Sequence, residues 1–272
     1  MSTEARGTCL AYGITLISHR GCRTISRNGA PLAPDNPWRS LRMPSRTLVA
    51  ALAAEAIGTF LFFVIGAGAV IMNAQTGGEV GLIGIALAHG LALAALGTAF
   101  ASISGGQFNP VVTVALWLVG KVRTIEGIRF IVAQLVGAAA AGYALKFAFG
   151  GFDAGDTAWS IAAGGAPSVS PALTQVTAIA VEAVLTALLV YAVLLTAVDK
   201  RAPQMGALFI GGVIIADIMV GGPLTGAAMN PARWFGPALA FGDLSAAVVY
   251  IVGPLIGAVV AALSVRYLFA ER

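Results

Sequence analysis

Six long apolar blocks are the feature that most restricts what this chain can fold into. A helix needs about 20 apolar residues to cross the hydrocarbon core of a bilayer. The blocks that reach this length run over about 47–73, 80–101, 125–149, 172–198, 203–222 and 245–269. Only 10% of the residues are charged, against roughly 25% in a soluble domain. We therefore expect an all-α membrane protein and exclude a soluble enzyme, a disordered chain and a nucleic-acid-binding module.

Two shorter apolar pieces, near 109–119 and 230–241, cannot span a bilayer, and both begin with Asn-Pro after a Gly-rich turn. Proline is well tolerated in the first helical turn, because its missing N–H would have no partner there. We interpret both pieces as re-entrant half-helices. Irregular backbone at membrane depth is tolerated only where protein buries it or where it lines a wet cavity. Two such breaks therefore indicate a pore or a central site.

The basic residues predict how the spans are oriented. If six spans alternate, 14 of the 16 Lys and Arg residues fall on one side, and the exceptions are Lys146 and Arg233. The connections on the opposite side carry the acidic residues Glu79, Asp153, Asp156 and Asp243. Because basic connections stay in the cytoplasm, we expect a multi-pass protein of the cell (inner) membrane with both termini cytoplasmic.

Residues 1–46 differ from the rest of the chain. They are Arg-rich, contain no span and no cleavable signal pattern, and hold Cys9, His19 and Cys22. Two cysteines at this spacing make neither a disulfide framework nor a metal site. The segment is interpreted either as a disordered, basic cytoplasmic tail or as a mis-assigned start, with translation beginning at Met43. We assign no function to it.

The membrane part contains an internal repeat over about 47–149 and 172–269. The matching pieces are 54–59 with 181–186, 109–111 with 230–232, and 130–137 with 250–257. Glu55 precedes the first Asn-Pro by 54 residues, and Glu182 precedes the second by 48. With three spans in each half, the second half must be inverted relative to the first. Such repeats place the functional site near the bilayer midplane, where the broken helices meet.

The residue at the start of each half-helix, Asn109 or Asn230, suggests a chemistry for that site. Local backbone N–H groups can hold the side-chain carbonyl of such an Asn, which leaves its NH₂ group free to donate into a pore. The two helix N-termini add a positive potential. A neutral solute meets hydrogen-bond donors there, whereas cations, including protons, are repelled.

These motifs resemble those of the aquaporins, the major intrinsic protein family. The specific pieces are 104–110 (SGGQFNP) and 229–233 (MNPAR), in which an Asn-Pro-Ala (NPA) motif is followed by Arg. The resemblance covers about 47–269 and implies an aquaporin-like channel domain over 47–272, a water channel assembled as a homotetramer. Its implied pore centre consists of Asn109, Pro110, Val111, Asn230, Pro231 and Ala232, with Val111 standing where the family usually has Ala.

The resemblance also implies a second constriction, a selectivity filter of four residues. Arg233 follows the second motif directly, and counting back without gaps gives Ala227 and Ile218; the second span supplies His89. Bacterial water-selective members usually carry Phe at the position of His89. We therefore expect a bacterial-type member whose filter is non-standard and wider than that of a strict water channel.

The implied function is passive transport of water and small uncharged solutes such as glycerol, urea, ammonia or metalloid acids. Trp234, after the motif Arg, matches neither the glycerol-conducting nor the water-selective pattern, so the sequence does not rank these solutes. We expect no enzymatic activity and no catalytic residues, because no nucleophile–base set is present. We also expect no metal, no cofactor and no nucleic-acid partner; the environment is the lipid bilayer.

Three intramembrane acids need an explanation. We expect Glu55 and Glu182 to be structural, each accepting hydrogen bonds from the backbone of its half-helix loop. Asp217 lies beside Ile218 and has no firm role. It pairs with His89 or Arg233, lies at a subunit contact, or indicates that the ungapped count that assigns Ile218 to the filter is off by one residue. Competing functions are a proton-coupled small-solute transporter using Asp217 and His89, a strictly water-selective channel, and a structural protein with a closed pore.

Overall fold

The structure is a computed structural model that describes residues 48–150, 158–199 and 205–269. The chain divides into two units, residues 1–45 and Arg46–Arg272, and only the second contains described residues. The interpretations of the basic tail, including those of Cys9, His19, Cys22 and Met43, lie outside the described ranges.

Six helices in the described ranges are long and apolar enough to cross a membrane. Four of them are continuous α-helices: α1 (Leu48–Gln75), α2 (Gly81–Phe100), α4 (Thr124–Phe149) and α7 (Gly206–Thr225). The fifth, α6 (Gln175–Ala192), continues as the π-helical turn η2 (Val193–Val198). The sixth, α9 (Ala247–Ser264), continues as the π-helical turn η3 (Val265–Phe269). Large apolar side chains such as Ile83, Val132 and Val184 remain exposed on outer faces. Apolar exposure on this scale suits lipid rather than water. The expected all-α, six-span fold is confirmed.

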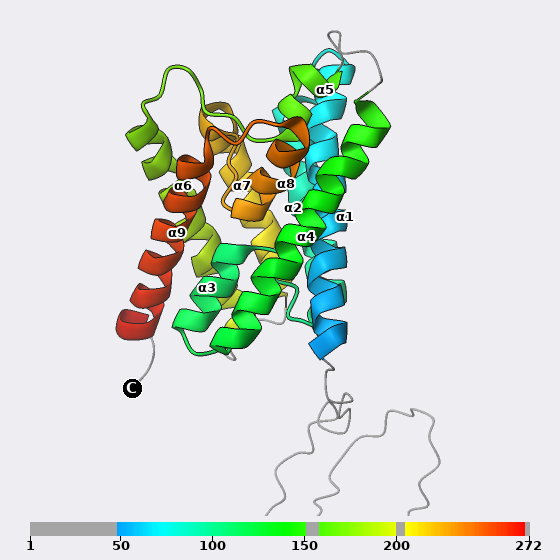
Figure 1. The fold of residues 1–272 in the computed structure, drawn as a ribbon. Coiled ribbons are helices and arrows are strands. Elements are labelled where there is room, and N and C mark those ends of the chain that lie inside the picture. Colours follow the sequence, from blue (N-terminus) through cyan, green and yellow to red (C-terminus); the bar gives the residue numbers. More distant parts are fainter. Residues whose placement is uncertain (1–47, 151–157, 200–204, 270–272) are drawn as a thin grey trace, which may run out of the picture. The chain divides into compact units, whose positions relative to one another are not determined.

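The two half-helices are α3 (Pro110–Leu118) and α8 (Pro231–Phe241), and both lie among the long helices (Figure 1). Each begins directly after an Asn with extended backbone and has Pro as its first residue. The helix ends follow from this local chemistry, because the Asn side chain caps the first turn and Pro has no N–H to lose.

The packing of the helices follows the internal repeat. In the first half α1 packs against α4, and in the second half α6 packs against α9 in the same way. The half-helices are exchanged between the halves, because α3 packs mainly against α9 and α8 against α4. Helices α2 and α7 pack against each other. Each half therefore completes the other, as expected for an inverted repeat.

Glycines bring the paired helices into close contact at equivalent points of the two halves. A Cβ atom added at Gly137 would lie 2.2 Å from the carbonyl oxygen of Ala56, and one added at Gly257 would lie 2.1 Å from that of Ala183. Small residues at helix crossings in membranes allow this backbone approach. The repeat seen in the sequence is thus also a repeat of packing contacts.

Replacing Gly257 with alanine is expected to destabilise the protein by about 1–3 kcal/mol or more, because the new methyl group meets backbone that cannot rotate away. The matched control is Gly212→Ala, also in the interior of a long helix, where an added Cβ has no neighbour within 4 Å. The control should raise stability by up to about 1 kcal/mol through helix propensity. Thermal denaturation of the two purified variants makes the comparison; equal melting temperatures would contradict it.

The connection between α4 and α6 contains two short elements that the sequence analysis did not predict. They are α5 (Ala158–Ile161) and the 3-10 turn η1 (Ala163–Gly165). Gly165 has a φ of +81°, and a Cβ there would lie 2.6 Å from the carbonyl oxygen of Ala67. Glycine satisfies both the left-handed backbone and the close contact. This connection brings the Gly165 carbonyl into the candidate site.

Candidate functional site

The N-termini of the two half-helices meet through a reciprocal pair of hydrogen bonds. The Asn109 side chain donates from Nδ2 to the carbonyl of Met229 (3.0 Å), and Asn230 donates from Nδ2 to the carbonyl of Phe108 (2.9 Å). Each Asn also accepts at Oδ1 from a backbone N–H of its own half-helix, from Val111 and Ala232 respectively. These bonds fix the orientation of both amides, and one N–H of each NH₂ group has no bond within the described structure.

The residue before each Asn has a left-handed backbone, with φ of +50° at Phe108 and +52° at Met229. This conformation costs a non-glycine residue roughly 1–2 kcal/mol. Buried glutamates stabilise this left-handed backbone. In the first half, Glu55 accepts hydrogen bonds from the N–H groups of Gln107 (3.0 Å) and Phe108 (2.8 Å). The carbonyls that receive the Asn amides belong to these two strained residues.

In the second half, Glu182 stabilises the loop before α8 through equivalent hydrogen bonds. It accepts from the N–H groups of Ala228 (2.9 Å) and Met229 (2.7 Å) and from the hydroxyl of Thr225 (2.6 Å). The corresponding hydroxyl donor to Glu55 is Ser104, also at 2.6 Å. Both glutamates are fully buried, so each carboxylate is satisfied by the loop that it shapes.

Beyond the glutamates the two halves differ. In the first half Gln134 donates to Glu55 (2.8 Å) and to Thr113 (3.0 Å), and Thr113 donates to Gln107 (2.6 Å). In the second half, Trp234 instead stacks on Tyr250, with ring centroids 5.9 Å apart, and the Tyr250 hydroxyl donates to the backbone carbonyl of Thr225. Sequence reasoning missed the polar chain. The signal was present, since Gln134 falls at the repeat position that Pro254 occupies in the second half.

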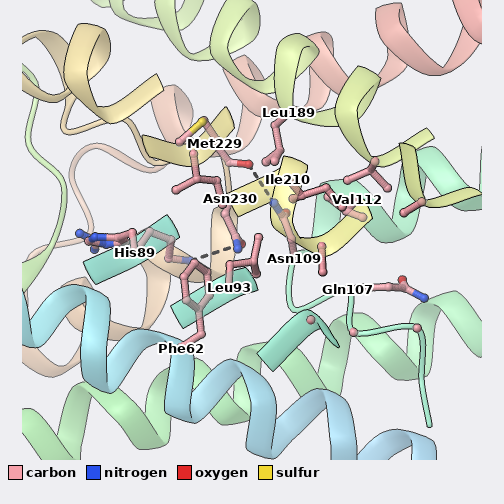
Figure 2. A pocket seen from close by; sticks show the side chains of 18 of the residues that line it. Phe62, His89, Leu93, Gln107, Asn109, Val112, Leu189, Ile210, Met229 and Asn230 are labelled. Atoms are coloured by element: carbon pink, nitrogen blue, oxygen red, sulfur yellow. Dashed lines mark hydrogen bonds between the residues drawn. The ribbon is translucent and has the colours of Figure 1, made fainter. Parts of the chain in front are cut away.

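A cavity of about 270 Å³ runs past the two Asn residues. Both Asn side chains line it, as do the four residues expected for the filter: His89, Ile218, Ala227 and Arg233. Figure 2 shows His89 towards one end of this cavity and Gln107 towards the other, with the Asn pair between them. The structure therefore brings the two Asn residues of the expected pore centre and all four expected filter residues to one cavity.

Four of the residues expected at the pore centre are not part of the cavity wall. Pro110, Val111, Pro231 and Ala232 form the first turns of the half-helices, and none of them lines the cavity. Val111 and Ala232 pack into the hydrophobic core. Their contribution at the centre is backbone, since their N–H groups hold the Asn side chains. Val112, one residue further along, lines the cavity instead.

His89 and Arg233 are hydrogen-bonded to each other. The His89 Nδ1 atom lies 2.9 Å from the carbonyl of Ile85, and a carbonyl can only accept, so Nδ1 carries a proton. Arg233 donates from Nε to His89 Nε2 at 2.9 Å, so Nε2 is unprotonated and the ring is neutral. Arg233 also donates from Nη1 to the carbonyl of Gly165 (2.7 Å). The guanidinium is thereby held from two sides.

The space for the imidazole ring depends on a glycine in α1. A Cβ added at Gly66 would lie 2.6 Å from two atoms of the His89 ring. Gly66 belongs to a Gly-Ala-Gly sequence at 66–68, and nothing in that local sequence indicates a role at the site. The positioning of Arg233 thus depends on two glycines from different parts of the chain, Gly66 behind its histidine partner and Gly165 as its carbonyl partner.

The cavity wall combines a few polar groups with apolar side chains. At the His89 end it carries the guanidinium of Arg233, and the Asn pair lies between this end and Gln107 (Figure 2). Much of the remaining wall is aliphatic and includes Val112, Leu116, Leu189, Val193 and Ile210. Such a passage combines a few fixed hydrogen-bonding groups with apolar walls, which is the arrangement that passes small neutral molecules and opposes cations.

Asp217 does not pair with His89 or Arg233, so that expectation is wrong. Arg233 and His89 are occupied by each other, and the described structure records no hydrogen bond to the Asp217 carboxyl, whose Oδ2 atom is buried without a partner. The side chain is 2% exposed within a single chain, so it does not lie on a surface available for a subunit contact. Its neighbour Ile218 lines the cavity and Asp217 does not, which fits the ungapped register.

Asp217→Leu is expected to leave water permeability unchanged and to raise stability by about 1–3 kcal/mol, because it replaces a buried carboxyl lacking a partner with an apolar side chain of similar size. Thermal denaturation and osmotic shrinkage of proteoliposomes measure the two quantities. A large loss of transport would mean that Asp217 takes part in conduction and would support the proton-coupled alternative.

The described part of the chain contains no group of three or more His, Cys, Asp or Glu side chains that could hold a metal ion. The polar side chains around the cavity are amides, one neutral histidine and one arginine. The amides can donate hydrogen bonds to a neutral molecule in the cavity, and the charge of Arg233 repels cations.

Comparison with known proteins identifies the class to which this fold and site belong. Residues 42–265 match the family described as Major intrinsic protein, and the chain belongs to that family.

Among its relatives, Aquaporin TIP2-1 of Arabidopsis thaliana is 40% identical over 215 residues, covering 76% of this chain and 82% of the relative. Aquaporin NIP1-1 of Zea mays is 34% identical over 212 residues, covering 78% and 72%. The crystal structure of the aquaglyceroporin from Plasmodium falciparum superposes with a TM-score of 0.72 at 25% identity, covering 82% of this chain and 98% of that one. The family is a channel family, as the sequence resemblance implied.

Proposed function

We propose that this protein is a passive transmembrane channel for water and small neutral solutes. The main observation behind this proposal is that the two Asn side chains and Arg233 line the same cavity. Hydrogen bonds fix the orientation of all three side chains. Relatives named as aquaporins, and a structural neighbour named as an aquaglyceroporin, support both parts of the solute range.

The selectivity filter of the proposed channel consists of His89, Ile218, Ala227 and Arg233. Three features support a filter looser than that of a strict water channel: an aliphatic Ile218, a small Ala227, and an arginine held against His89 and Gly165. The proposed solutes are therefore water together with glycerol, urea, ammonia or neutral metalloid acids. The strictly water-selective channel remains the alternative.

Further parts of the proposal rest on the sequence. The basic connections support cytoplasmic termini in a cell (inner) membrane. A homotetramer with one pore per subunit and a bacterial-type filter are implied by the family resemblance. The unit that contains the pore is 47–272, with the repeats at about 47–149 and 172–269.

Stopped-flow light scattering on proteoliposomes tests the channel. With an impermeant osmolyte, fast shrinkage demonstrates water conduction; with glycerol or urea, shrinkage followed by fast re-swelling demonstrates solute conduction. Shrinkage without re-swelling would leave a water channel and overturn the wider filter. Rates equal to those of protein-free vesicles would overturn the channel itself.

His89→Phe is expected to slow urea or glycerol re-swelling by about fivefold or more, a factor that corresponds to one lost hydrogen bond of about 1 kcal/mol, while osmotic water flux is retained. Phenylalanine offers neither the Nε2 acceptor for Arg233 nor a polar contact for solutes. Unchanged solute flux in correctly folded protein would exclude His89 from the filter. Ala227→Thr is the less suitable substitution, because Ala227 has a φ of +46° and β-branched residues strongly disfavour that region.

A further inference from the structure

A second and larger pocket lies away from the pore, where the start of α1, the end of α3 and the start of α4 come together. Its volume is about 930 Å³. Its apolar wall includes Leu48, Ile103, Trp117, Ile125 and Phe130. Neither the pore nor the filter uses this pocket.

The pocket contains two arginines without a protein partner. Arg123 and Arg129 both line it, both are exposed, and the described structure records no hydrogen bond or ion pair for either. Glu126 also lines the pocket, but no ion pair joins it to either arginine. The described structure likewise records no bond from the first N–H groups of α4, and the residue before that helix, Arg123, makes no side-chain cap. The pocket therefore offers unused cationic and N–H donors to an anion.

The position of Arg129 indicates where such an anion comes from. On α4, Ile125, Ile128 and Val132 are 60%, 54% and 56% exposed, and together they form the lipid-facing stripe of a spanning helix. Arg129 lies between them, about 8 Å along the helix axis from its start. A cation at this depth on a lipid-facing surface extends to the headgroup layer. Trp117, 45% exposed with its indole N–H bound to Thr124, is the kind of residue that lies at that interface.

We propose that this pocket binds the headgroup of an acidic phospholipid from the leaflet on the basic side of the protein. The phosphate lies between Arg123 and Arg129, and the acyl chains follow the exposed stripe of α4. Charge complementarity favours this occupant over the chain's own N-terminal segment, since residues 1–46 contain seven arginines against one Glu and one Asp. A basic segment is repelled by two unpaired arginines, whereas an acidic lipid is attracted.

Native mass spectrometry of the full-length protein tests the site, with dioleoylphosphatidylglycerol as the acidic probe and dioleoylphosphatidylcholine as the neutral reference. Arg123→Ala and Arg129→Ala are each expected to weaken phosphatidylglycerol binding by about fivefold, the effect of one arginine near an anionic headgroup. Arg129→Lys should retain most of the binding. Glu126→Gln should strengthen it, because the substitution removes a negative charge from the pocket wall.

Lys121→Ala is the matched control. It removes a positive charge from the same α3–α4 connection, but Lys121 does not line the pocket, so binding should be unchanged. Equal weakening by the control would mean general attraction to a basic face and would overturn the site. Equal wild-type affinity for the two lipids would also overturn it, as would displacement of the lipid by inorganic phosphate, which would indicate a site for soluble anions. The melting temperature of each lipid-free variant verifies its fold.

Discussion

Replacing Arg233 with glutamine is expected to raise proton and cation leakage through the pore by about a hundredfold. Arg233 carries the only cationic side chain among the described residues that line the cavity. A unit charge about 5 Å from a passing cation, at an effective dielectric constant of about 20, opposes it by roughly 3 kcal/mol. The half-helix dipoles and the Asn donors remain in the variant, so exclusion should fall without disappearing.

The leak is measured in proteoliposomes that contain a pH-sensitive dye, with a potassium diffusion potential as the driving force. Arg233→Lys is the matched variant, because it keeps the charge and loses the two-sided hold by His89 and Gly165. It should exclude protons nearly as well as the wild type. If glutamine and lysine leak equally, geometry rather than charge governs exclusion and the electrostatic argument fails.

Glu182→Ala is expected to lower stability by about 3 kcal/mol or more, because it leaves three buried donors without an acceptor: the hydroxyl of Thr225 and the N–H groups of Ala228 and Met229. For a domain of this size, that loss corresponds to a melting temperature lower by about 6 °C or more. Water permeability should fall as well, because the Met229 carbonyl that positions Asn109 is part of the released loop.

Glu126→Ala serves as the control for this substitution, since it removes a carboxylate for which the described structure records no hydrogen bond. It should change the melting temperature little. Glu182→Gln keeps one acceptor oxygen and should lie between the two. A Glu182→Ala variant as stable as the control would mean that the loop does not depend on its carboxylate.

Sequence reasoning predicted the architecture well where each element has a local cause. Hydrophobic length sets the six spans, and the ends of the half-helices follow from Asn-Pro, since capping and the missing proline N–H act within one turn. The positions of Glu55 and Glu182 in the repeat predicted which loops each would face. All of these inferences depend on residues that carry their signal in their own neighbourhood.

Relations between distant residues could not be predicted in this way. Whether Arg233 binds His89 or Asp217 depends on how α2, α7 and α8 rotate about their axes, and no local pattern determines that rotation. The Gly165 carbonyl was missed because its function comes from backbone, which has no residue signature. Val112 lines the cavity in place of Val111. Consecutive residues point about 100° apart around a helix, and a motif match does not determine which of the two faces the cavity.

The exchange of half-helices also restricts the order in which the protein can be built. The amide of Asn109 binds a carbonyl 120 positions further along the chain, and α3 packs against α9, near the C-terminus. At the usual pace of synthesis, the ribosome needs on the order of ten seconds to supply that partner. During this interval the loop before α3 lacks the hydrogen-bond partner that the second half supplies. We therefore expect the first half to remain at the translocon until the second half has been synthesised.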